Sequence, residues 1–163
     1  MPMYTTAALL DIHARTHRSL TGTLDHLATL PAENLQRTVE GFSYPTLCSQ
    51  LHHVFGAERY WFEVLQGSIR LDDDEAEHRD LASLRALRAS VEATTAQYLG
   101  RLSDDDVSAA RTVKNWKGDE VSLLPAHVLL RTQTHAYQHQ GEIASMLRQL
   151  GHGFPPGLDF PLA

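Results

Sequence analysis

The sequence predicts an all-α fold, a bundle of four helices with a short hairpin or an irregular loop before the last helix. Four segments carry apolar residues at helical spacing, and proline or glycine interrupts the chain between them. The chain has 163 residues, of which 42% are hydrophobic, and this is enough to bury one sizeable core. We therefore expect a single domain over residues 1–163.

The first two helices are bounded by proline and glycine. Leucines recur at helical spacing from about Thr6 to Leu30, and Pro31 cannot continue that helix. The second helix is expected from about Pro45, which suits a first turn, to Gly67, which suits a C-cap.

The second half of the chain predicts two more helices. Residues 72–78 are mostly acidic and predict a solvated loop, and the third helix follows from about Leu81 to Leu102. Residues 111–121, with a turn at 117–119, predict the short hairpin or irregular loop. The fourth helix is expected from about Ser122 to Gly151, before a tail rich in proline and glycine.

Composition excludes several functional classes. A formal charge of -6 disfavours a nucleic-acid-binding surface, which is normally basic. No apolar run approaches the roughly 18 residues of a membrane span, and the N-terminus lacks a secretion signal, so we expect a cytoplasmic protein that does not bind membranes. The single cysteine, Cys48, excludes an internal disulfide and a cluster of zinc-binding thiolates.

Two histidines of the fourth helix form the most informative motif. His135 and His139 are four residues apart, which leaves them about 40° apart around a helix and about 6 Å apart along it. Both fall on the apolar stripe of that helix, with residues such as Val128 and Met146. On the second helix, His53 shares the apolar arc and the adjacent His52 does not. Three inward imidazoles would suit zinc or nickel.

Spacing alone leaves alternatives open. An inward histidine is more often a hydrogen-bonded core residue than a metal ligand. His13 and His17 are also four residues apart and also share a face with leucines, so spacing offers two candidate sites without ranking them. A ferritin-like di-metal bundle would need repeated Glu-x-x-His motifs, and the one such string, at residues 75–78, falls in the acidic loop.

Three segments, at residues 51–61, 135–143 and 150–160, resemble the DinB-like family of bacterial metal-binding four-helix bundles. In that family a histidine precedes a glutamate by five residues and a tryptophan by eight, as His53 precedes Glu58 and Trp61. Two further histidines occur in a pattern like HxxxHRGQ, which matches His135 and His139. This resemblance ranks His53, His135 and His139 above the other pair.

The resemblance implies an up-down-down-up bundle, often a homodimer, that holds a divalent metal through His53, His135 and His139 with one coordination position open. The sequence departs from the family where Gln140 and Glu142 replace the commoner arginine and glutamine. Glu142 projects toward the metal face, where it would orient a ligand histidine, act as a general base, or simply be a hydrogen-bonded polar residue.

Some members of the wider family transfer low-molecular-weight thiols to electrophiles or isomerise thiol adducts. A metal with three neutral ligands can lower the pKa of a small thiol, so we expect a metal-dependent S-transferase with a thiol co-substrate and a small-molecule substrate. The alternative is a non-catalytic metal-binding stress-response or interaction protein. Cys48 lies on the far side of the helical wheel from His53 and is expected to be buried and inert.

The remaining histidines receive lesser roles. His17 lies at a depth similar to that of His139, so we expect it beside the metal ligands or on the substrate side. His13 is expected at the edge of the core. Surface or hydrogen-bonding roles are expected for His26, His78, His127 and His152.

Overall fold

The computed structural model describes residues 2–70 and 74–162, and the described part is mostly helical, as the sequence predicts. The long helices are α1 (Thr6–Leu27), α2 (Leu47–Gln66), α3 (Leu81–Leu99) and α5 (Pro125–Gln149). The smaller elements are α4 (Asp104–Ser108), strands β1 (Arg111–Lys114) and β2 (Glu120–Leu123), and two 3-10 turns, η1 (Ala32–Leu35) and η2 (Glu75–Glu77).

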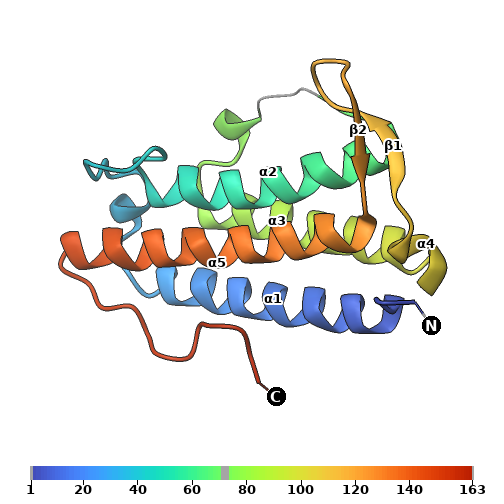
Figure 1. Ribbon diagram of the computed structural model, residues 1–163. Coiled ribbons are helices and arrows are strands. Elements are labelled where there is room, and N and C mark those ends of the chain that lie inside the picture. Colours follow the sequence, from blue (N-terminus) through green and yellow to red (C-terminus); the bar gives the residue numbers. More distant parts are fainter. Residues whose placement is uncertain (1, 71–73, 163) are drawn as a thin grey trace.

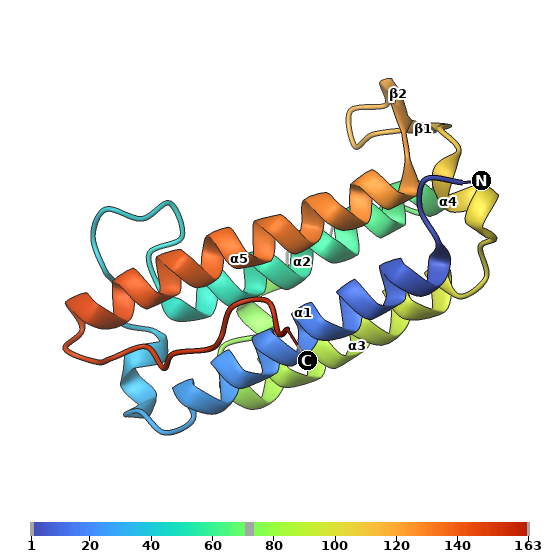
Figure 2. The ribbon, with the colours of Figure 1, turned by 60° about the horizontal axis from the view of Figure 1, so that its bottom comes forward.

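The long helices lie side by side along one axis (Figures 1 and 2). Helices α1 and α5 run in one direction, and α2 and α3 run in the opposite direction. Helix α2 packs against α3 and α5, and α1 packs against the same two helices from the other side. Each long helix therefore has two long neighbours, and α2 and α5 are in extensive contact.

Local capping explains where the second helix begins and ends. Thr46 and Ser49 form a reciprocal capping box, so α2 begins at Leu47, and Pro45 precedes the N-cap instead of lying in the first turn. Gly67 ends it with φ +67°, a conformation that favours glycine. Helix α1 ends at Leu27 rather than at Leu30, because the last residues before the proline form a turn.

Two helix boundaries in the second half of the chain differ from expectation. Helix α3 ends at Leu99 instead of Leu102, and the five-residue helix α4, capped by Ser103, follows soon after. Of the two alternatives for residues 111–121, the hairpin is the one that forms, with Arg111 paired to Leu123 across the strands. Because Ser122 is the second-last residue of strand β2, α5 begins at Pro125 rather than at Ser122.

The interior consists of two apolar clusters with a polar layer between them. Along α1, His13 and His17 lie between Leu9 of one cluster and Leu20 of the other. The same polar layer includes Glu58 of α2 and, on α5, His139 and Gln140, all of which are buried. Burying so many polar groups is costly unless each finds a partner, so their hydrogen bonds must be accounted for.

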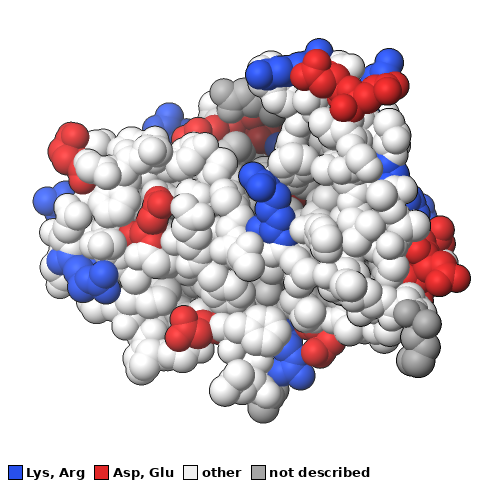
Figure 3. Space-filling view, in the orientation of Figure 1, with Lys and Arg blue, Asp and Glu red and all other residues white. Residues whose placement is uncertain are grey.

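The surface seen in Figure 3 is mostly uncharged, with acidic and basic side chains scattered over it and both signs gathered over the hairpin. Within the described residues, none of the helices combines the length and the apolar character that crossing a membrane requires.

Candidate metal centre

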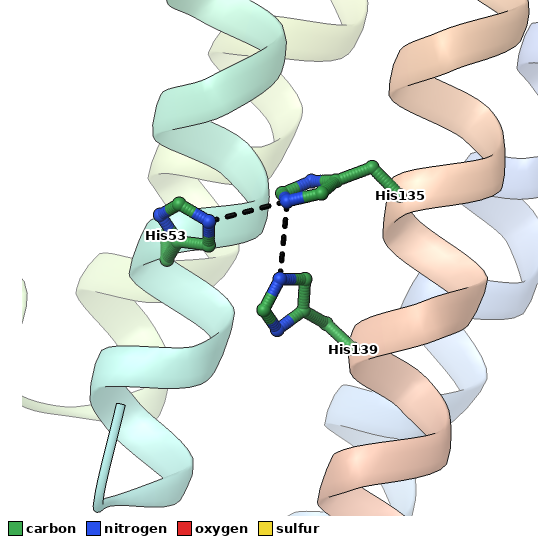
Figure 4. Close-up of side chains that lie close together, drawn as sticks. All are labelled: His53, His135 and His139. Atoms are coloured by element: carbon green, nitrogen blue, oxygen red, sulfur yellow. Dashed lines mark hydrogen bonds between the residues drawn. The ribbon is translucent and has the colours of Figure 1, made fainter. Parts of the chain in front are cut away.

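Three histidines from two helices converge between α2 and α5 (Figure 4). The Nε2 atom of His135 lies 3.2 Å from Nε2 of His53 and 3.1 Å from Nε2 of His139. One turn of α5 places His135 and His139 on the same face, and the packing of α2 against α5 adds His53. The structure thus brings together the three histidines that the sequence singled out.

The spacing of these nitrogens fits a tetrahedral metal ion. Zinc–nitrogen bonds of about 2.0–2.1 Å in a tetrahedron place the ligand nitrogens about 3.3 Å apart. The two Nε2–Nε2 distances, 3.1 and 3.2 Å, are close to that value. The group could therefore hold a metal ion without a large movement of its side chains.

A hydrogen-bonded chain behind His139 fixes which of its nitrogens faces the centre. The side-chain amide of Gln50 donates to the carbonyl of Tyr44 at 3.0 Å and to Oε2 of Glu142 at 2.8 Å. Its oxygen Oε1 is therefore the acceptor that faces Nδ1 of His139. His139 must carry its proton on Nδ1, so its Nε2 presents a lone pair to the centre.

The environment keeps the three imidazoles neutral. Burial, reinforced by the neighbouring imidazoles, lowers the pKa of His53 from 6.5 to about 4. Burial also lowers the pKa of His139, and it lowers that of His135 together with the nearby His139 and the positive charge of Arg131. Neutral imidazoles are the form that binds metal, so the electrostatics and the geometry agree.

Tyr44 covers one face of His53, and a pocket adjoins the centre. The ring of Tyr44 stacks on His53 with 3.9 Å between ring centroids and meets His139 edge-on at 5.9 Å. Beside His53 and His135 lies a pocket of about 390 Å³. Its other lining residues are Gly56, Ala57, Tyr60, Trp61, Arg131 and Thr132. A pocket of this size next to the ligands can admit a small molecule.

The second pair of histidines binds a carboxylate instead. The Nε2 atoms of His13 and His17 lie 2.9 and 3.1 Å from the carboxylate oxygens of Glu58. On its other side, His17 presents Nδ1 to the guanidinium of Arg88 at 3.5 Å, so Nδ1 is the acceptor and Nε2 carries the proton donated to Glu58. Burial favours a raised Glu58 pKa, but the hydrogen bonds from both histidines outweigh it and hold the pKa well below its usual range.

His17 therefore groups with His13 and Glu58, and it also bonds to Arg88. The expectation that it lies beside the metal ligands or on the substrate side stays a prediction. Glu58 follows His53 by five residues, which places it about 140° away around α2. It therefore faces α1 rather than α5, and its carboxylate bonds to both histidines of α1. His13 is 1% exposed and is thus a core residue rather than one at the core edge. His13, His17 and Glu58 lie close enough together to hold a metal ion as well. In the structure, however, both imidazoles are bonded to the Glu58 carboxylate.

The two departures from the family pattern have different surroundings. Gln140 is buried, and its amide donates to the hydroxyls of Ser19 and Thr23 at 3.1 and 2.8 Å, which ties α5 to α1. Glu142 lies behind His139, with its Oε2 3.5 Å from Nδ1 of that histidine and hydrogen-bonded to Gln50. Gln50 was absent from the sequence-based site, although its position three residues before His53 puts both on one face of α2.

Cys48 lies away from the centre, as expected. It is 2% exposed, and its thiol donates to the carbonyl of His78 at 3.0 Å. Burial raises the pKa of the thiol. A protonated, buried thiol is a poor nucleophile, which agrees with an inert role.

The acidic loop is exposed at Glu75–Glu77, as predicted, but Asp74 is partly buried and paired. Asp74 accepts hydrogen bonds from Arg59 at 2.7 and 3.0 Å and from His52 at 2.7 Å, and His78 lies 3.4 Å away. These contacts hold the loop against the outer face of α2, where His52 bonds to Asp74. The predicted loop residues 72 and 73 lie outside the described part of the chain.

Three further histidines make the hydrogen bonds predicted for them. His26 bonds to the carbonyl of Gly153, His127 to the hydroxyl of Tyr4, and His152 to the amide of Asn34.

Comparison with known protein families identifies the family of this chain. The sequence profile of the DinB family matches residues 3–163, almost the entire chain. None of the curated proteins compared with the chain matches it. The chain belongs to the DinB family.

Proposed function

We propose that this protein binds one divalent metal ion, zinc or nickel, through His53, His135 and His139. The observation that carries the proposal is the convergence of three neutral imidazoles, with the free Nε2 of His139 set by its bond to Gln50. Neutral nitrogen ligands suit either ion. In this proposal the long helices are an up-down-down-up bundle that holds α2 and α5 at the spacing the site requires.

We further propose that the protein is a metal-dependent S-transferase. A bound metal would lower the pKa of a small thiol, so that the thiol reacts as a thiolate near neutral pH. The sulfur would form a bond to an electrophilic carbon, the leaving group would depart with its electron pair, and the thiol proton would pass to solvent. The pocket beside His53 and His135 offers space for the reactants.

The chain's own residues would bind and orient rather than attack. Tyr44 would hold the ring of His53 by stacking, and Gln50 would hold the ring of His139. Glu142 lies behind His139, on the side away from the pocket lining, and this supports an orienting role over a role as general base. Cys48 would remain outside the reaction.

A non-catalytic metal-binding protein is the alternative, because its ligands would be the same. Incubating the metal-loaded protein with a small thiol and an electrophile distinguishes the two, since a binding protein gives no turnover above the free metal. Cys48→Ser should keep the rate of thiol transfer. A Cys48→Ser variant that is fully loaded with metal but inactive would overturn the mechanism. The homodimer and the cytoplasmic location stay predictions.

The ligand assignment has its own test. Metal content should fall from about one ion per chain to near zero in His53→Ala, because two imidazoles bind far more weakly than three. The adjacent His52→Ala is the matched control, since His52 faces Asp74. Loss of metal in the control but not in His53→Ala would refute the assignment.

A further inference from the structure

The pocket beside the metal-binding histidines carries a positive charge of its own. Arg131 lines this pocket together with His53 and His135. It precedes His135 by one turn of α5, about 6 Å along the helix. No aspartate or glutamate is among the residues that line the pocket. In a chain with a formal charge of -6, this is a local reversal of sign.

The surroundings of Arg131 leave its charge unneutralised. Five other arginines form ion pairs with carboxylates: Arg15, Arg59, Arg85, Arg88 and Arg111. Arg131, in contrast, lies over the ring of Trp61, 5.3 Å from its centroid, and within the described residues no carboxylate pairs with it. Stacking on Trp61 orients the guanidinium while its N–H donors stay available.

The effect of this charge reaches the centre. Arg131 and His135 line the same pocket and lie one turn apart on α5, so their side chains share one face of that helix. A divalent ion held by three neutral ligands would add two further positive charges at the same pocket. A neutral ligand would leave both positive groups unmatched, whereas a ligand with two anionic groups would match them.

We propose that Arg131 selects a thiol co-substrate that carries a carboxylate, with the sulfur directed to the three histidines and the carboxylate to the guanidinium. The proposal rests on the metal-dependent thiol chemistry proposed above. Because Arg131 and His135 line one pocket from adjacent turns of α5, a small mercapto acid could contact both. The partner is thus a low-molecular-weight anionic thiol rather than a neutral one.

The test uses the full chain loaded with cobalt(II), whose absorption spectrum changes when a thiolate binds. The probes are 3-mercaptopropionate and its neutral amide, 3-mercaptopropionamide, which have the same length. The variants are Arg131→Gln and, as matched control, Arg148→Gln. Arg148 is an exposed arginine on the same helix, close to Ser145 and outside the pocket lining, so both variants change net charge equally.

The wild type should bind the acid about tenfold more tightly than the amide, the scale of one charge-assisted hydrogen bond. Arg131→Gln should remove this preference and leave amide binding unchanged, while Arg148→Gln should keep the preference. Equal binding of the two probes by the wild type, or a preference that survives in Arg131→Gln, would overturn the proposal and leave the thiol chemistry intact. Bound cobalt whose spectrum responds to neither thiol would instead overturn the proposed function, and this inference with it.

Discussion

Oε1 of Gln50, on α2, accepts a hydrogen bond from Nδ1 of His139, on α5. This hydrogen bond decides which ring nitrogen of His139 faces the centre. The Gln50 amide is itself held by Tyr44 and Glu142, so its orientation is fixed from two further directions. The lone pair that would face a metal ion is thus set in advance by Gln50, Tyr44 and Glu142, which are not among the proposed ligands.

Replacing Gln50 by Met should weaken metal binding about 10–100-fold, because methionine has a similar size but cannot accept the Nδ1 proton strongly. Competition with a chromophoric chelator would measure the affinity. Gln66→Met, at the exposed end of the same helix, is the control and should bind metal normally. An unchanged affinity in Gln50→Met would show that this contact does not orient the ligand.

Metal should stabilise the folded protein, because the ligands come from two helices that separate on unfolding. At free metal one hundred times the dissociation constant, the gain is about 2.7 kcal/mol, or roughly 5–10 °C in Tm for a chain of this length. Thermal melts with and without chelator would measure it. The metal-free protein should still unfold cooperatively, since its two apolar clusters do not depend on the ion.

The stability of the metal-free protein should fall as the pH drops from about 6.5 toward 4. The pKa of His53 is lowered from 6.5 to about 4, so within this window the unfolded chain binds more protons than the folded one. Proton binding therefore favours the unfolded chain between pH 6.5 and pH 4. The stability that depends on neutral His53 is fully present only above pH 6.5. The free energy of unfolding, measured with urea at pH 7 and at pH 5, should fall less in His53→Gln than in the wild type. Equal losses in the two proteins would contradict the assignment of this effect to His53.

Removing the carboxylate of Glu58 should destabilise the fold without changing the metal centre. Glu58→Ala leaves the buried donors of His13 and His17 without their acceptor, a cost of about 2–5 kcal/mol. Glu58→Gln keeps one acceptor oxygen and should lose less. Denaturant unfolding measures the stability of both variants. Their metal content should remain near one ion per chain. A metal content that falls from two ions to one would mean that the cluster of His13, His17 and Glu58 also holds an ion.

Local periodicity explains what could be predicted from the sequence. The apolar stripes located the long helices to within a few residues, and the same wheel positions separated the inward His53 from the outward His52. Both inferences depend only on the 3.6-residue repeat, which neighbouring residues along one helix determine. The five-residue helix α4 is too short to show such a repeat, and it was missed.

The tertiary structure decided which inward groups meet. The sequence placed His13, His17 and His139 on apolar stripes but did not specify their partners, and helix packing assigned His17 to Glu58 and His139 to Gln50. It also fastened Asp74 of the acidic loop to Arg59. Each of these pairs joins different elements, so their meeting depends on the relative rotation and offset of packed elements, which no single stretch of sequence determines.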